Sequence, residues 1–246
     1  MKNPEKEIKK WWNLASEYYQ IEISKDKMDD VHYGPFGSSE KKLHLLGDIK
    51  KKRILELGCG AGQVSIALAK EGGVCTGIDI SEKQIAKAIK NAKSEGVNVN
   101  FVIMPFSSIK KLLKTKFDIV ISVMALQYCY NLKKLFADVN NLLNANGLFI
   151  FSLEHPFYLS INPNNLKLTE KYSLEGLKKD KSDTGEYIYF HRKLSTIINF
   201  LVSSGFSLEN VLEPIEKPDK IWGVGYRMAL VNRLGPTIIF KSIKKK

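Results

Sequence analysis

The stretch RILELGCGAGQVSIALAK, residues 53–70, decides the fold. An apolar run leads into three alternating glycines, Gly58, Gly60 and Gly62, and an amphipathic pattern begins directly after them. Glycine allows a sharp turn and lets a ligand approach the main chain, and the first turn of the following helix points its N–H groups at the same place. The stretch therefore predicts a strand, a ligand-binding turn and a helix.

Two acidic residues narrow the choice of ligand. Glu56 stands just before the glycine turn, where a carboxylate would repel a pyrophosphate but suits a positively charged amino group. Gln63 occupies the place where a dinucleotide-binding fingerprint has its third glycine. Asp79 ends the next predicted strand, where an acid can accept hydrogen bonds from both hydroxyls of a ribose. S-adenosylmethionine (SAM) combines a ribose and an α-amino group without a phosphate.

Strands and helices are expected to alternate after residue 53, which predicts βαβ units and a parallel sheet covered on both faces. The expected strands are 53–57, 74–79, 99–103, 117–123 and 147–153, with two more near 206–213 and 236–242. The expected helices are 4–20, a short one from Ser39, 62–71, 81–95, 131–144 and 192–204. Residues 154–190, rich in Asn, Pro, Gly and charge, are expected to form a long connection.

Four motifs in order resemble those of class I SAM-dependent methyltransferases: ILELGCGAG, TGIDIS, FDIVISVMALQY and LLNANGLFIFS. The resemblance covers about residues 35–153. It implies a Rossmann-like, seven-stranded mixed α/β sheet with helices on both faces and an antiparallel last strand. It also implies one methyltransferase domain over 1–246, with an N-terminal helical cap at 1–36 and a substrate-side insertion at 154–190.

The resemblance implies that SAM is the cofactor and S-adenosylhomocysteine (SAH) the product. It places the methionine half near the glycine turn, the ribose at Asp79 and the adenine beside Ile80. The family often has an acid after the third strand; Pro105 stands there instead, so Phe106 is expected to serve the adenine through its backbone or ring. The residues implied to bind the cofactor are Glu56, Gly58, Cys59, Gly60, Gln63, Asp79, Ile80, Gln84, Phe106 and Val123.

His155 is the candidate general base, because it follows the fifth predicted strand, outside whose carboxyl end ligands bind in open α/β sheets. The alternative is a histidine that orders its loop through hydrogen bonds. Tyr18, Tyr33, Tyr128 and Arg192 are the candidate substrate-binding residues. Arg192 either meets a substrate carboxylate or forms a surface salt bridge. The four histidines show no metal-ligand spacing, and no metal is expected.

The composition is that of a globular chain of 246 residues with a net charge of +12. The lysines are scattered without interleaved aromatics, which favours a solvated surface over a nucleic-acid site. We expect no membrane span, no secretory leader, three unpaired cysteines and a cytoplasmic location. The predicted function is methyl transfer to an oxygen or nitrogen of a small molecule. An RNA- or protein-directed methyltransferase and a non-catalytic SAM-binding regulator remain alternatives, and the oligomeric state is open.

Overall fold

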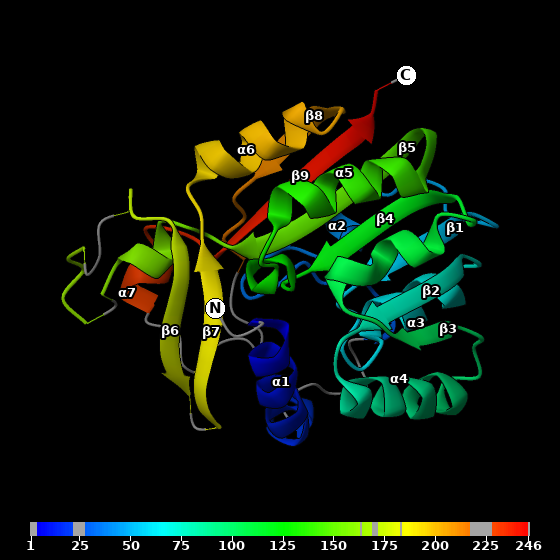
Figure 1. Ribbon diagram of the computed structural model, residues 1–246, viewed down its shortest axis with the longest axis horizontal. Coiled ribbons are helices and arrows are strands. Elements are labelled where there is room, and N and C mark those ends of the chain that lie inside the picture. Colours follow the sequence, from blue (N-terminus) through cyan, green and yellow to red (C-terminus); the bar gives the residue numbers. More distant parts are fainter. Residues whose placement is uncertain are drawn as a thin grey trace.

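The computed structural model describes residues 4–21, 28–162, 164–168, 172–182, 184–216 and 228–245, without the side chains of 18–21. A seven-stranded sheet forms its centre, in the order β3-β2-β1-β4-β5-β9-β8 (Figure 1). The strands are β1 Arg53–Leu57, β2 Val74–Asp79, β3 Asn100–Ile103, β4 Phe117–Val123, β5 Leu143–Glu154, β8 Phe206–Leu212 and β9 Thr237–Lys244. The pairs from β3 to β5 are parallel, and β9 is antiparallel to both β5 and β8. The predicted seven-stranded mixed sheet is therefore confirmed.

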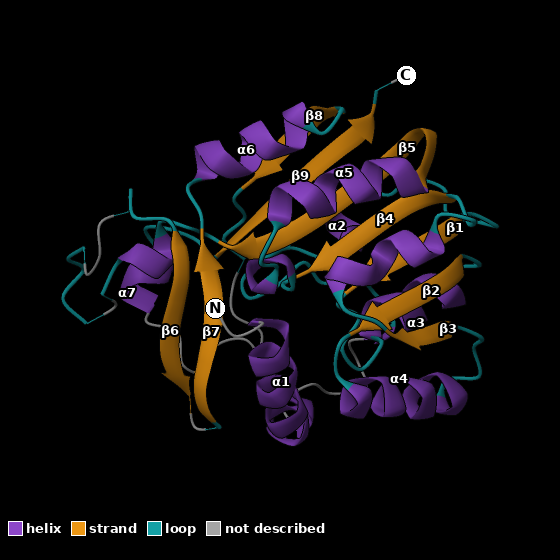
Figure 2. Cartoon of the chain, in the orientation of Figure 1, coloured by secondary structure: helices purple, strands orange, loops and turns teal. Residues whose placement is uncertain are grey.

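Helices cover both faces of this sheet (Figure 2). One core cluster joins the sheet to α5 and α6, and another joins its opposite face to α3 and the segment around α2. The helices are α1 Pro4–Ile21, α2 Glu40–Leu43, α3 Gln63–Lys70, α4 Glu82–Ser94, α5 Leu132–Leu142, α6 Leu194–Ser203 and α7 Met228–Val231. Short 3₁₀ turns occur at η2 Phe106–Leu112, η3 Leu126–Tyr128 and η4 Tyr158–Ser160.

The strands are buried because their apolar side chains face helices on both sides. In β4 the burial alternates little, as expected for a central parallel strand. On β5, Phe149 and Phe151 belong to one core cluster and Ile150 to the other. Parallel strands all end at one edge of a sheet, so the loops after β1, β2 and β4 meet there and can form a site.

Residues 154–190 are not only a long connection, as the sequence suggested. They contain an antiparallel hairpin, β6 Gly176–Ser182 and β7 Gly185–His191, which forms a separate two-stranded sheet. The hairpin stands beside α1 at the edge of the molecule (Figure 1). The single-domain assignment of 1–246 stays a prediction.

Candidate active site

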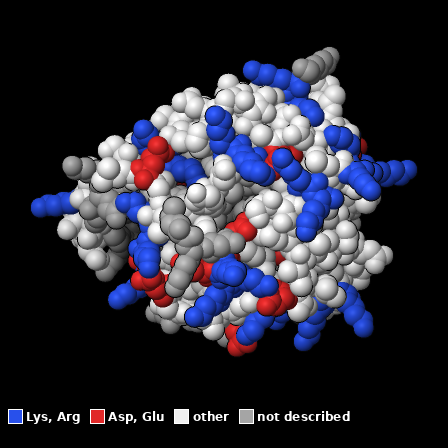
Figure 3. Space-filling view, viewed as in Figure 1, with Lys and Arg blue, Asp and Glu red and all other residues white. Residues whose placement is uncertain are grey.

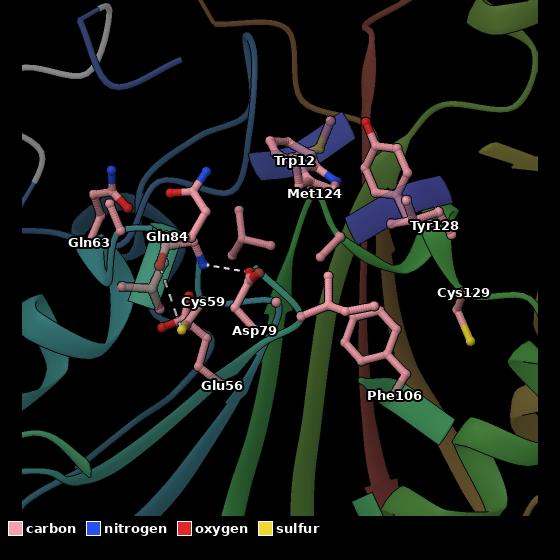
Figure 4. A pocket seen from close by; sticks show the side chains of 18 of the residues that line it. Trp12, Glu56, Cys59, Gln63, Asp79, Gln84, Phe106, Met124, Tyr128 and Cys129 are labelled. Atoms are coloured by element: carbon pink, nitrogen blue, oxygen red, sulfur yellow. Dashed lines mark hydrogen bonds between the residues drawn. The ribbon is translucent and has the colours of Figure 1, made fainter. Parts of the chain in front are cut away.

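A cavity lies at the carboxyl ends of β1, β2 and β4, under α1. All ten residues predicted to bind the cofactor line it: Glu56, Gly58, Cys59, Gly60, Gln63, Asp79, Ile80, Gln84, Phe106 and Val123. Of the predicted substrate-binding residues, Tyr128 lines it as well. Figure 4 shows Glu56 and Asp79 in the lower left part of the view, Phe106 at the lower right, and Trp12 and Tyr128 above them. We call this space the cofactor cavity.

The glycine turn is shaped by contacts that only glycine permits. Gly58 has φ +72°, and a Cβ there would lie 2.3 Å from the Cβ of Ala125. Gly62 has φ +85°, and its Cβ would lie 2.7 Å from the ring of Phe101. The turn therefore sits tightly against the loop after β4, and α3 begins directly at the cavity wall.

Asp79 is held at the end of β2 by backbone N–H groups. One carboxylate oxygen accepts from Gly60 N at 3.0 Å and the other from Ser81 N at 2.8 Å. Burial raises the pKa of this carboxyl, and the backbone hydrogen bonds oppose that shift. The carboxylate is thus fixed in direction, and each oxygen retains a lone pair for a ligand hydroxyl.

Glu56 lies deeper, with 3% of its surface exposed. Its Oε2 accepts from both the backbone N–H of Ser65, at 2.9 Å, and the Ser65 hydroxyl. Burial raises the pKa of Glu56 to about 8, and the charge of Asp79 adds to the rise. A group that loses water in this way favours a nearby cation over an anion.

The cavity lining carries an acidic set of charges. Four carboxyl groups line it, on Glu5, Asp30, Glu56 and Asp79, and no Lys or Arg among the described residues does. Its apolar lining includes Ile80, Met104 and Phe106. The arrangement suits a flat apolar group joined to hydroxyls and a positive charge, and it disfavours a phosphate.

The helix α1 covers the cavity. Ile8 and Trp12 line it, and Trp12 meets Tyr128 edge to face at 5.3 Å. Polar contacts fix the helix to the sheet domain: Ser81 Oγ donates to Asn13 at 2.6 Å, and Lys9 pairs with Glu82 at 2.7 Å. Such a cover excludes water from the space beneath it.

Sequence reasoning missed several lining residues. Met124 and Ala125 follow β4, and Met124 has φ +52°, an uncommon backbone conformation at the cavity. Trp12, His32 and Tyr130 also line the cavity. The signal for Met124 and Ala125 was their place directly after the fourth strand, whereas the other three depend on the tertiary fold.

Two predicted substrate-binding residues, Tyr33 and Arg192, lie elsewhere. The side chain of Tyr33 is fully buried in the core, and its hydroxyl donates to Glu40 at 2.6 Å. Arg192 donates to the backbone carbonyls of Cys129 and Tyr130 and does not line the cofactor cavity. It forms no salt bridge among the described residues, and the other alternative, contact with a substrate carboxylate, stays a prediction. The side chain of Tyr18 is outside the described residues.

His155 does not line the cofactor cavity either. Its Nδ1 accepts from the backbone N–H of Phe157 at 3.1 Å, so Nε2 carries the proton and contacts Glu213 at 2.7 Å. Both ring nitrogens are therefore engaged in holding the loop after β5. This geometry favours the loop-ordering alternative, and we do not assign His155 the role of base.

The described part of the chain holds no group of three His, Cys, Asp or Glu side chains that could bind a metal. Within the same residues, none of the helices has the length and apolar character needed to cross a membrane.

Comparison with known proteins gives a family match over the site. Residues 48–193 match the model of a family described as a methyltransferase domain. The chain is 29% identical over 195 residues to an uncharacterized protein of Haemophilus influenzae, covering 73% of this chain and 77% of that one. It is also 29% identical over 142 residues to a ubiquinone biosynthesis O-methyltransferase of Coxiella burnetii.

That second alignment covers 58% of this chain and 56% of the Coxiella protein, so the chain matches little more than half of the enzyme's length. Among solved structures, an S-adenosylmethionine-dependent methyltransferase of Mesorhizobium loti superposes with a TM-score of 0.67. The sequence identity is 24%, over 82% of this chain and 95% of that one, and the likeness shows a shared fold.

Proposed function

The chain belongs to the methyltransferase domain family and is a SAM-dependent class I methyltransferase, and from this premise we propose that it methylates an oxygen or nitrogen of a small molecule. The observation that supports the proposal best is the cofactor cavity: an acidic, partly apolar space closed by aromatic side chains of α1 and η3.

The residues present fit SAM in charge and shape. SAM carries a sulfonium and an ammonium group, and the lining offers four carboxyl groups and no described Lys or Arg. We assign the ribose hydroxyls to Asp79, whose two oxygens are fixed by Gly60 and Ser81. We assign the ammonium group to Glu56 and the adenine to the apolar surface of Ile80 and Phe106.

When bound, SAM supplies an electron-poor methyl group, which an acceptor lone pair takes in line as the carbon–sulfur bond breaks and its electrons remain on sulfur. The protein contributes by positioning SAM and the acceptor and by excluding water. Trp12 and Tyr128 do both, since they cover the end of the cavity away from Glu56 (Figure 4).

The cover that α1 forms over the cofactor cavity supports a small acceptor over a polymer. α1 lies across the cavity and is tied to α4 by the Lys9–Glu82 and Ser81–Asn13 contacts. The +12 charge does not by itself favour RNA, because Lys and Arg are spread over the whole visible face (Figure 3). The three cysteines are free and buried, which supports the cytoplasmic location that we propose.

SAH formation tests the proposal. Purified protein is incubated with SAM and a fraction of metabolites below about 1 kDa, and in parallel with total RNA. We expect SAH to accumulate above the no-acceptor rate with the metabolites. Turnover only with RNA, falling steeply as salt is raised, would contradict the small-molecule assignment.

A further inference from the structure

A second cavity of about 770 Å³ adjoins the cofactor cavity. It lies between the starts of α1 and α5, the β6–β7 hairpin and α6, and we call it the hairpin cavity. Tyr130 lines both cavities, so the two spaces meet at that side chain. No residue assigned above to SAM lines it.

The wall beside Tyr130 is aromatic. Tyr130 packs edge to face on Phe190, with ring centroids 5.7 Å apart. The guanidinium of Arg192 lies 5.3 Å from the centroid of the Phe190 ring. Leu132, Leu177 and Phe200 extend this apolar surface. Such a wall suits a planar apolar body with an anionic substituent near the guanidinium.

Arg192 is a largely buried cation without an ion-pair partner among the described residues. Burial lowers its pKa, and Glu175 opposes the shift only electrostatically, since no described carboxylate lies within ion-pair distance of Arg192. Its guanidinium donates to the carbonyls of Cys129, Tyr130 and Phe190. Of its five N–H groups, two have no acceptor in the described structure, which leaves room for a bound anion.

The other charged groups of the hairpin cavity are mostly neutralised. Glu175 pairs with Lys193 at 3.9 Å, and Lys179 pairs with Glu186 at 2.7 Å while also interacting electrostatically with Glu7. Lys133, on the first turn of α5, has no ion pair in the described structure. Glu7 also has no ion pair in the described structure, so the lining carries Lys133, Lys179 and Arg192 against Glu7 and Glu175, an excess of positive charge that is opposite in sign to the cofactor cavity.

We propose that the hairpin cavity binds the body of the methyl acceptor and that the acceptor is a planar, apolar molecule with an anionic group. The anion lies against Arg192 and Lys133, and the nucleophile reaches past Tyr130 to the cofactor cavity. The inference rests on the proposed function, which it deepens by naming the acceptor class.

Two fluorescent probes of matched shape test the binding site. Anilinonaphthalene sulfonate carries an aromatic body and an anion, and phenylnaphthylamine has the same body without the charge. Both are titrated into the full chain saturated with SAH, so that the cofactor cavity is filled. We expect the sulfonate to bind about 10-fold or more tightly than the neutral probe.

Three variants separate the contributions. Thr196→Trp, which narrows the hairpin cavity from α6, is expected to weaken binding of both probes. Lys133→Gln and Arg192→Gln are expected to lower the affinity for the sulfonate probe about 3-fold and 10-fold, respectively, with little change in the affinity for the neutral probe. Lys87→Gln, on the exposed face of α4, is the matched control and should change neither.

Each outcome decides the matter. Equal binding of both probes to wild type and Thr196→Trp overturns the site, and equal losses for both probes in the Lys133 variant overturn the anion preference. Because Arg192 also supports the loop around Tyr130, the Lys133 variant keeps the test valid if Arg192→Gln unfolds. SAH affinity is measured in parallel, and a wild-type protein that does not bind SAH would refute the proposed function instead.

Discussion

Protonation of Glu56 should control cofactor affinity. Its pKa is raised to about 8 by burial, so in the free protein near neutral pH the carboxyl is mostly protonated. An ammonium group placed beside it requires the ionised form. Cofactor binding should therefore release a proton, and affinity should rise with pH.

The size of the effect follows from linkage. With a pKa of about 8, the ionised fraction of Glu56 rises from about 1% at pH 6.0 to about 24% at pH 7.5. After allowance for partial loss of the ligand's own amino proton, with an α-amino pKa of about 8, the gain in affinity is about 20-fold, or about 1.8 kcal/mol.

Titration calorimetry of SAM at pH 6.0, 6.5, 7.0 and 7.5 measures this gain. Repeating pH 6.5 in buffers with different ionisation enthalpies gives the number of protons released, which should be close to one. Glu56→Gln keeps the shape of the side chain and removes its titration. We expect the variant to bind more weakly by about 1–3 kcal/mol, with little dependence on pH.

The raised pKa of Glu56 also predicts that folding stability depends on pH, and Glu56→Gln tests this. Because the native pKa of Glu56 lies above its ordinary value of 4.5, the native state holds this proton more tightly than the unfolded state. The contribution of Glu56 is full below pH 4.5 and is lost as pH rises toward 8, by at most about 5 kcal/mol. Glu56→Gln should flatten that slope in denaturant unfolding.

Two results would refute the reasoning about binding. One is a wild-type affinity for SAM that does not change between pH 6.0 and 7.5, and the other is a 20-fold rise in affinity that persists in Glu56→Gln.

Three further changes test other parts of the site. Asp79→Asn should weaken SAM by about 1–3 kcal/mol in calorimetry without unfolding the sheet, and unchanged affinity would reject the ribose assignment. Gly58→Ala places a Cβ 2.3 Å from that of Ala125 at φ +72°; it should lower thermal stability and abolish SAM binding, and a variant with normal binding would show that the turn can yield. His155→Ala should destabilise folding by about 1–3 kcal/mol yet keep the cofactor affinity and the pH profile of turnover; loss of one ionisation from that profile would restore the general-base role.

The sheet was predictable because its signals are local. The four strands from 53 to 123 are short apolar runs, and each is followed by a turn and then by a helix or a 3₁₀ turn. Glu56, the glycines and Asp79 lie at strand ends, and parallel strands bring their ends to one edge. The ten expected cofactor residues therefore meet in one cavity without any long-range information.

The hairpin was missed because it lacks that pattern. Six of the seven residues of β6, GLKKDKS, are polar or glycine, and none is buried. Its strand character comes from pairing with β7, whose Ile188 and Phe190 pack against Ile8 of α1. A sequence scan sees only a polar, turn-rich connection at this place.

His155 and Tyr33 show a second limit. Each was placed by its position along the chain, but its role depends on a partner that pattern reasoning did not supply. Glu213, beyond α6, contacts the imidazole of His155, and Glu40 accepts from Tyr33. A polar residue near a strand end is as easily satisfied by the protein as by a ligand, and only the fold tells which.

The charges of the chain also act locally. The net charge of +12 favours acidic partners at long range, but salt screens surface lysines within about 10 Å. Inside the cofactor cavity Asp79 is desolvated and little screened by salt, and Glu56 becomes negative when it releases its proton to a bound ammonium group, so the field that the bound cation meets is negative. Arg192, also desolvated, makes the local field positive on the other side of Tyr130. An acceptor that bridges the two cavities is therefore oriented by its own charge, with its anion held away from the carboxyl groups that hold the cofactor.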